Sequence, residues 1–301
     1  MNKPEKAGRF FVPIMEGFEE RTIKTSGATI SAWIGGSGPP LLLLHGYPQT
    51  HVMWHKVAPT LAERFTVVAT DLRGYGKSEK LDGGEAHVNF SKRAMALDQV
   101  EVMRQLGFAR FAVVGHDRGA RVAHRMALDH PNAVEKVALL DIAPTDTMYG
   151  ATDKAFATAY YHWFFLIQPY DLPERLITSD PGFYLRKTLN AWCKTPNAFP
   201  EEVMAEYVSA FSDPDAIHSA CEDYRASAGI DLLHDAEDSH YKIDQPLLVV
   251  WGDQGVVGNS FDVVDVWRKR AVDVRGRALP CGHFPAEEVP EMLLEELKAF
   301  F

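Results

Sequence analysis

An aspartate occupies the centre of a short glycine-flanked motif, Gly115-His116-Asp117-Arg118-Gly119. The motif has the G-x-S-x-G spacing of a sharp turn between a strand and a helix, but Asp117 stands where that turn usually carries a serine. A serine that displaced a leaving group from a saturated carbon would form an ether, which water does not readily cleave. A carboxylate forms an ester instead, which water can cleave to restore Asp117. The motif therefore predicts substitution at saturated carbon, as in haloalkyl compounds or epoxides.

A histidine and a second acid complete the set of groups that hydrolysis of such an ester needs. His283 is the candidate general base that would activate the water. Asp141 is the preferred carboxylate to orient its imidazole, and Asp253 is the competitor. The backbone N–H groups of Tyr47 and Arg118 are expected to form the oxyanion hole that receives charge during the attack of water. The chain order of nucleophile, acid and histidine resembles that of α/β-hydrolases.

Two arginines follow the nucleophile within one helical turn. Arg118 and Arg121 would lie on the same side of the helix that begins after the motif. Two guanidinium groups beside an anionic nucleophile predict a site for a carboxylate substrate, held in fork geometry. The alternative is that one of them pairs with a surface acid such as Asp71 or Asp146.

The elements that must position these residues can be read from short apolar runs bounded by glycine, proline or polar residues. Such runs are typical of strands buried on both faces, and they cover residues 41–44, 66–70, 111–114, 137–140 and 247–251. A hairpin is expected before them, over Arg21–Lys24 and Thr29–Ile34. Helical patterns cover Val52–Arg64, Lys92–Leu106, Ala120–His130 and Pro290–Phe300. This alternation predicts an α/β fold with a doubly wound, mostly parallel sheet, in which ligands bind at the carboxyl ends of the strands.

The alternation breaks between Pro144 and about His240. That stretch is rich in aromatic residues and in amphipathic helix patterns, which predicts a helical cap inserted into the α/β domain. The expected division is a core domain over residues 1–145 and 240–301, with the cap over residues 146–239.

Composition excludes several classes of protein. The chain of 301 residues is 46% hydrophobic and 24% charged, which is the balance of a globular protein with a sizeable core. Its apolar runs are too short to cross a bilayer, and the net charge of −10 argues against nucleic acid as a partner. The polar start Met1–Gly8 lacks the features of a signal peptide, so a cytoplasmic location is expected. Three scattered cysteines predict neither disulfides nor a metal site, and no cofactor is expected.

Six motifs, spread over almost the whole chain, together resemble those of one known family. They are His45-Gly46-Tyr47-Pro48-Gln49-Thr50, Gly115 to Arg121, Leu140-Asp141-Ile142-Ala143-Pro144-Thr145, Tyr161-His162-Trp163, Cys221-Glu222-Asp223-Tyr224-Arg225 and Gly282-His283-Phe284. With them the chain resembles the haloacetate (fluoroacetate) dehalogenase family of the α/β-hydrolase fold, which converts a haloacetate to glycolate and halide.

The resemblance implies a role for each matching residue. It implies Asp117 as nucleophile, Asp141 as acid and His283 as base, with Arg118 and Arg121 holding the substrate carboxylate. It also implies that three residues of the insertion donate hydrogen bonds to the departing halide, namely His162, Trp163 and Tyr224. Neutral donors of this kind would stabilise fluoride, a poor leaving group, as its charge develops. The implied partners are a small anionic haloacid, water and a second copy of the chain in a homodimer.

Two other functions use the same residues. An epoxide hydrolase would keep the aspartate, histidine and acid, and would protonate the opening ring with a tyrosine such as Tyr160, Tyr161 or Tyr224. A neutral epoxide would gain nothing from the paired arginines. The second alternative is a catalytically silent binding protein of this fold.

Overall fold

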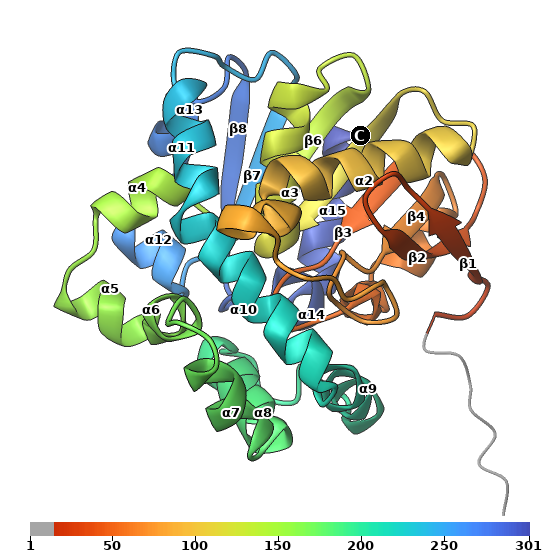
Figure 1. Ribbon diagram of the computed structural model, residues 1–301. Helices are drawn as coiled ribbons and strands as arrows, with labels where there is room; N and C mark the ends of the chain where they lie inside the picture. The colour runs from red at the N-terminus through yellow and green to blue at the C-terminus, as the bar shows by residue number, and fades with distance from the viewer. Residues whose placement is uncertain (1–14) are drawn as a thin grey trace, which may run out of the picture.

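The computed structural model describes residues 15–301 (Figure 1). The expectation drawn from Met1–Gly8 concerns residues outside this range. Within it, eight strands form one sheet in the order β1-β2-β4-β3-β5-β6-β7-β8. The strands are β1 (Glu19–Lys24), β2 (Thr29–Gly35), β3 (Pro40–Leu44), β4 (Thr66–Thr70), β5 (Phe111–His116), β6 (Val134–Leu140), β7 (Leu247–Gly252) and β8 (Val274–Leu279).

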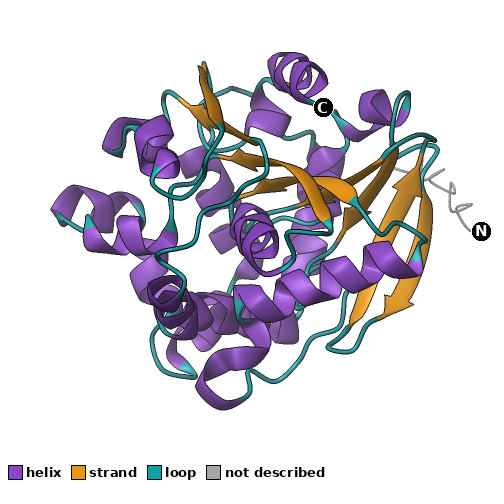
Figure 2. Ribbon diagram, turned by 90° about the horizontal axis from the view of Figure 1, so that it is seen from above, coloured by secondary structure: helices purple, strands orange, loops and turns teal. Residues whose placement is uncertain are grey.

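The predicted hairpin and the five predicted strands are confirmed. β1 and β2 form the antiparallel hairpin, β2 also pairs antiparallel with β4, and the strands from β4 to β8 along the sheet run parallel. The four leucines of β3 are fully buried because helices cover both faces of the sheet (Figure 2). The doubly wound, mostly parallel α/β-hydrolase fold is therefore the observed one.

Helices pack on both sides of this sheet. In Figure 1 α2 (Lys92–Gln105) and α3 (Arg118–Asp129) lie in front of the strands, and α15 (Pro290–Phe300) lies behind them. The other elements of the core are the 3₁₀ turns η1 (His51–Trp54) and η2 (Glu85–Phe90), and the helices α1 (Ala58–Ala62), α12 (Val256–Ser260), α13 (Val263–Arg268) and α14 (Pro285–Glu288).

One predicted helix and one strand differ from the structure. The single helix expected over Val52–Arg64 is wrong, because the segment forms η1 and then the short α1. Pro59 in the first turn of α1 has no N–H to continue a helix from the preceding turn. The edge strand β8 was not expected, since its exposed Arg275 and Arg277 interrupt any apolar run.

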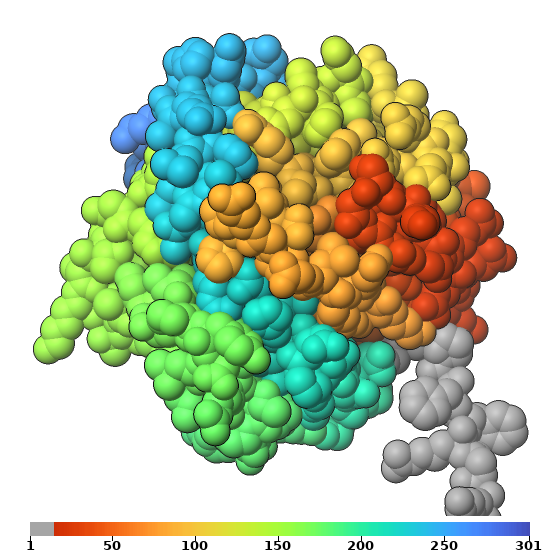
Figure 3. Space-filling model, in the orientation of Figure 1, coloured from red at the N-terminus to blue at the C-terminus, as the bar shows by residue number. Residues whose placement is uncertain are grey.

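Between β6 and β7 the chain forms only helices, which we call the inserted helices. They are α4 (Thr145–Gly150), α5 (Lys154–Ala159), α6 (Tyr161–Leu166), α7 (Leu172–Thr178), α8 (Pro181–Trp192), α9 (Glu201–Phe211), α10 (Pro214–Ala228) and α11 (Ile230–Glu237). In the space-filling view this green and cyan segment packs directly against the core (Figure 3). The predicted helical insertion is therefore present, and its exact boundary as a separate domain stays a prediction. Of the helices in residues 15–301, none combines the length and apolar character needed to cross a membrane.

Candidate active site

Asp117 lies on the sharp turn between β5 and α3. Its φ of 47° is in the left-handed region, which a residue other than glycine adopts at a cost and often at functional sites. The glycines on either side permit this turn. A Cβ on Gly115 would lie 2.4 Å from the carbonyl oxygen of Gly119, and a Cβ on Gly119 would lie 2.4 Å from that of Leu44. The motif therefore forms the strand-to-helix turn that its spacing predicts.

The two carboxylate oxygens of Asp117 have different surroundings. Oδ1 accepts a hydrogen bond from the backbone N–H of Tyr47 at 2.8 Å, whereas Oδ2 lies 3.9 Å from Nε2 of His283. Burial raises the pKa of Asp117, but the nearby His283 and other positive groups outweigh it and leave this pKa below its usual value. Arg118 is the first residue of α3, where backbone N–H groups have no acceptor within the helix. The turn thus holds an ionised carboxylate with one oxygen fixed by the backbone N–H of Tyr47, next to the free N-terminal end of α3.

His283 is oriented by Asp141. Its Nδ1 lies 2.6 Å from Oδ2 of Asp141, and the other oxygen of Asp141 accepts the backbone N–H of Gly252 at 3.0 Å. Burial lowers the pKa of His283, but the hydrogen bond and charge of Asp141 raise it more, so the net shift is upward. The competing carboxylate, Asp253, is exposed. Of the two candidate acids, the structure brings Asp141 to the histidine.

Arg118 points into the inserted helices and is held there by Asp223 on α10. Its Nε lies 3.0 Å from Oδ2 of Asp223, and its Nη2 donates to Oδ1 of Asp223 and to Oγ of Ser227, both at 2.5 Å. The remaining nitrogen, Nη1, is buried and has no hydrogen-bond partner among residues 15–301. Asp71, one of the two surface acids considered as a partner, bonds to His51 and not to this arginine.

Arg121 is buried without a carboxylate partner in the described part of the chain. Its Nη1 donates to the carbonyl of Ala143 at 3.1 Å and to Oγ1 of Thr145 at 2.8 Å, while its Nε has no partner there. Asp146, the other expected surface acid, pairs with Arg270 instead. A buried cation without a counter-ion is unfavourable, so this geometry suits the binding of an anion.

The three residues from the inserted helices meet above these arginines. His162 and Trp163 lie on α6 and Tyr224 on α10, with ring centres 5.6 Å apart for His162 and Tyr224 and 6.5 Å apart for Trp163 and Tyr224. The Cζ of Arg118 lies 4.2 Å from the ring centre of Tyr224, and that of Arg121 lies 4.8 Å from that of Trp163. Burial lowers the pKa of His162 to about 3, so its imidazole is neutral.

Two of these aromatic side chains carry polar atoms that lack a partner. The Tyr224 hydroxyl and Nδ1 of His162 are buried and make no hydrogen bond to any residue that the structure describes. Buried polar groups are ordinarily satisfied, so such atoms are candidates for contact with a ligand.

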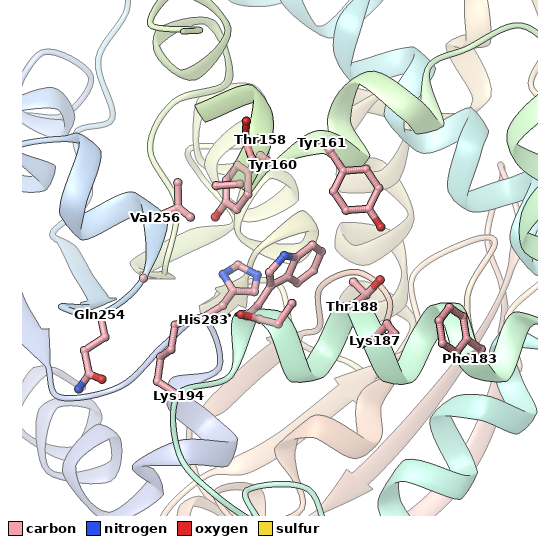
Figure 4. A pocket seen from close by; sticks show the side chains of 14 residues that line it. Thr158, Tyr160, Tyr161, Phe183, Lys187, Thr188, Lys194, Gln254, Val256 and His283 are labelled. Carbon is pink, nitrogen blue, oxygen red and sulfur yellow. Dashed lines mark hydrogen bonds between the residues drawn. The ribbon is translucent and has the colours of Figure 1, made fainter. Parts of the chain in front are cut away.

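A cavity of about 510 Å³ reaches His283 from the inserted helices (Figure 4). Tyr160 and Tyr161 lie on one side of it and Thr188 and Lys187 of α8 on the other, with His283 between them. Trp192, at the end of α8, also lines the cavity.

The cysteines and acids suggest no other reactive centre in the described part of the chain. Cys193, Cys221 and Cys281 are free thiols, and burial raises the pKa of each. Among residues 15–301 no cluster of three or more His, Cys, Asp or Glu side chains could hold a metal ion.

Sequence reasoning missed two residues that hold the site together. Asp223 belongs to one of the motifs that carry the resemblance, but the pattern assigned it no role. His116 occupies the second position of the turn motif, and its Nε2 lies 2.7 Å from the backbone carbonyl oxygen of His283. Burial lowers the pKa of His116 to about 3, so the neutral ring donates its Nε2–H to that carbonyl. Neither contact has a signal in sequence spacing, because each joins residues more than a hundred positions apart.

Comparison with known proteins relates the whole chain to one family. A family profile described as "alpha/beta hydrolase fold" matches residues 39–290. A fluoroacetate dehalogenase from Burkholderia sp is 46% identical over 95% of both chains, and a soluble epoxide hydrolase from Corynebacterium sp is 38% identical over 88% of this chain and 91% of its own. The crystal structure of a putative α/β hydrolase from Nostoc sp is 59% identical, with a TM-score of 0.93 over 94% of this chain and 97% of its own.

Proposed function

The chain belongs to the α/β-hydrolase family, and on that premise we propose that it is a hydrolytic dehalogenase that converts haloacetates such as fluoroacetate or chloroacetate to glycolate and halide. Membership of the family supports a hydrolase, and the similarity to a fluoroacetate dehalogenase supports the reaction. The fold alone would not select a substrate.

One observation carries the choice of a haloacid. Nη1 of Arg118 and Nε of Arg121 are buried and have no partner in residues 15–301, and both arginines lie in the first turn of α3, just after the nucleophilic aspartate. A guanidinium nitrogen is always a donor and needs an acceptor when it is buried. A substrate carboxylate would satisfy both nitrogens and would place the carbon next to it near Asp117. We therefore assign to these arginines the binding of the substrate carboxylate.

In the first step, Oδ2 of Asp117 attacks the carbon that bears the halogen. The C–O bond of an ester forms as the carbon–halogen bond breaks, and the halogen leaves with the bonding electrons. Its developing charge accepts hydrogen bonds from His162, Trp163 and Tyr224. The unpartnered Tyr224 hydroxyl and the neutral imidazole of His162 support this assignment.

In the second step, His283 takes a proton from water as the water oxygen adds to Cγ of Asp117. The negative charge that develops on the carbonyl oxygen of the ester, Oδ1 of Asp117, is stabilised by the N–H groups of Tyr47 and Arg118. The bond between Cγ and the alkyl oxygen then breaks, and the glycolate oxygen takes the proton from His283. Asp117 is regenerated with one oxygen from water. The hydrogen bond from His283 to Asp141 supports the charge that the imidazole carries between these transfers.

Epoxide hydrolysis is the second candidate. Tyr160 and Tyr161 line the cavity that reaches His283, and one relative is named a soluble epoxide hydrolase. A phenol there could protonate an opening ring. This reaction would leave the buried guanidinium nitrogens of Arg118 and Arg121 without an acceptor, which is why we rank it second.

Purified protein should be incubated with fluoroacetate, chloroacetate and styrene oxide while halide release and diol formation are measured. We expect halide release that Asp117→Asn abolishes. Diol formation without halide release would reverse the ranking. A silent binding protein is tested by His283→Asn, in which the ester on Asp117 should accumulate and be detected by mass spectrometry; a chain that only binds would form no ester.

The route of water gives a second test. In one turnover in water labelled with ¹⁸O, the label should enter the carboxylate of Asp117, and the first glycolate should be unlabelled. Label in the first glycolate would mean that water attacks the substrate directly. We also propose a homodimer, as the resemblance implies, which light scattering of the purified protein would check.

A further inference from the structure

The carboxylate of Glu288, in α14, accepts hydrogen bonds from four backbone N–H groups. Its Oε2 accepts from Lys194 at 2.7 Å, from Thr195 at 3.0 Å and from Gly282 at 3.0 Å, and its Oε1 accepts from Phe284 at 2.9 Å. The residue is 7% exposed, and the mechanism above does not use it. Among residues 15–301 none of these four N–H groups has another acceptor, so the Glu288 carboxylate is the group that satisfies them.

Two of these donors flank the general base. Gly282 and Phe284 are the neighbours of His283 on either side, so the Glu288 carboxylate fixes the peptide groups before and after it. The backbone of His283 is itself held at both ends, because its N–H donates to the carbonyl of Trp192 at 3.1 Å and its carbonyl accepts from His116. The backbone of the base is therefore fixed independently of the bond between its side chain and Asp141.

The other two donors belong to the inserted segment. Lys194 and Thr195 lie in the loop between α8 and α9, close to Trp192. The ring of Trp192 lies 5.4 Å from that of His283 and 4.4 Å from that of His162, measured between centres. The two segments also approach closely, since a Cβ on Gly282 would lie 2.2 Å from the carbonyl oxygen of Trp192. Glu288 thus joins the loop that carries His283, residues 282–284, to the inserted segment at residues 192–195.

We propose that Glu288 is a positioning residue that sets the place of the His283 imidazole relative to Asp117 and to the segment Trp192–Thr195. This inference rests on the proposed function, because Glu288 is assigned to the second of the two steps of the proposed dehalogenase reaction. The attack of Asp117 on the substrate does not involve His283, whereas the hydrolysis of the ester does. Misplacing the imidazole therefore slows the second step and leaves the first largely intact.

Position 288 needs a carboxylate because all four groups that face it are N–H donors. An ionised carboxylate offers only acceptors, with room for about four hydrogen bonds. A glutamine has one acceptor oxygen, and its NH₂ group would face backbone N–H groups, so Glu288→Gln leaves at least one of the four N–H groups without an acceptor and brings two donors together. Glu287 provides a matched control. It is also buried, its Oε1 accepts from the Tyr207 hydroxyl and its Oε2 lies 3.7 Å from Nζ of Lys56, but its side chain makes no hydrogen bond to residues 282–284.

The control substitution is a mild one. Burial raises the pKa of Glu287 to about 8, which favours the protonated form, and glutamine matches that form in shape and charge. Glu287→Gln should therefore keep the rates of both steps.

The experiment measures both steps in rapid-quench reactions of the full chain with chloroacetate. For Glu288→Gln we expect a chloride burst of one equivalent at close to the wild-type rate, then turnover slowed at least tenfold, with the ester on Asp117 visible by mass spectrometry. Glu288→Asp, which keeps the charge on a shorter side chain, should recover part of the turnover. Thermal melting of each variant monitors folding.

Three outcomes would overturn the proposal. One is an unchanged turnover of Glu288→Gln. Another is an equal loss in the burst and in turnover. The third is a failure of both Glu288 variants to fold while Glu287→Gln folds, which would make Glu288 a general structural support. Each of these differs from failure of the proposed function, in which the wild-type protein itself would release no chloride.

Discussion

Asp223 fixes the guanidinium plane of Arg118, with Nε of the arginine 3.0 Å from Oδ2 of the aspartate and Nη2 2.5 Å from Oδ1. The aspartate is itself held by the Tyr75 hydroxyl at 2.7 Å and by Lys92. With these bonds, Nη1 is the one guanidinium nitrogen of Arg118 that has no partner among residues 15–301. Under the proposed function, this ion pair would select which donor of Arg118 faces the substrate carboxylate.

Replacing Asp223 by asparagine should weaken substrate binding more than it slows chemistry. The neutral amide does not hold the guanidinium with two acceptors, so Arg118 loses its fixed plane and KM for chloroacetate rises by roughly tenfold or more. Since the substitution also breaks a buried ion pair, it should lower the free energy of unfolding by about 3–5 kcal/mol. Steady-state kinetics and chemical denaturation measure the two effects.

A double-mutant cycle with Arg118→Leu separates a direct role of Asp223 from one exerted through the arginine. If Asp223 acts only through Arg118, the double variant should bind chloroacetate no more weakly than Arg118→Leu alone. Additive losses in binding would mean that Asp223 contributes to the site independently.

Replacing Arg121 by glutamine should affect charged substrates selectively. A hydrogen bond to an ionised group contributes about 1.5–3 kcal/mol, so kcat/KM for chloroacetate should fall roughly 10- to 100-fold. Chloroacetamide, which has the same reacting carbon without the carboxylate, should be a poor substrate of the wild-type protein and should lose little in the variant. Equal losses for both compounds would contradict the assignment of Arg121 to the substrate carboxylate.

The sequence predicted those parts of the site that depend on local chemistry. The glycines around Asp117 permit the sharp turn at that point, and the buried runs such as Leu41–Leu44 specify strands whose carboxyl ends lie together. The choice of Asp141 over Asp253 needed more than chain position. The two acids follow neighbouring strands of the sheet, β6 and β7, and only the three-dimensional structure shows which one points toward His283.

Contacts between the core and the inserted helices were beyond sequence reasoning. Asp223 reaches Arg118 from 105 residues away, and Glu288 bonds to Lys194 across 94 residues. Neither acid differs in its local pattern from a residue on a solvated helix face. Tertiary packing alone distinguishes them, since it buries each acid against donors from another element.

The rate of ester hydrolysis should depend on the protonation of His283. The imidazole must be neutral to take a proton from water, and the hydrogen bond and charge of Asp141 outweigh burial and raise the pKa of His283. Hydrolysis should therefore slow as pH falls through a value above the ordinary histidine pKa of about 6.5, while the chloride burst persists because the pKa of Asp117 is lowered. The profile is measured by quenching at each pH.

Asp141→Asn tests the origin of this shift. It should slow hydrolysis of the ester by roughly 100- to 10,000-fold and move the acid limb to lower pH, with the burst retained. A wild-type limb at or below pH 6.5 would show that Asp141 does not raise the pKa of the base.

The role of Tyr224 should appear in the choice of halide. Its hydroxyl is buried without a partner among the described residues, and fluoride, a poorer leaving group than chloride, depends more on donors at its developing charge. Tyr224→Phe keeps the ring packed against Arg118 and removes only the hydroxyl, so fluoroacetate turnover should fall roughly 100-fold and chloroacetate turnover by less than about tenfold. Thr188→Val, which removes a buried hydroxyl lining the cavity, is the matched control and should leave the ratio of the two rates unchanged. A Tyr224→Phe variant that lost both activities equally would place this hydroxyl away from the halide.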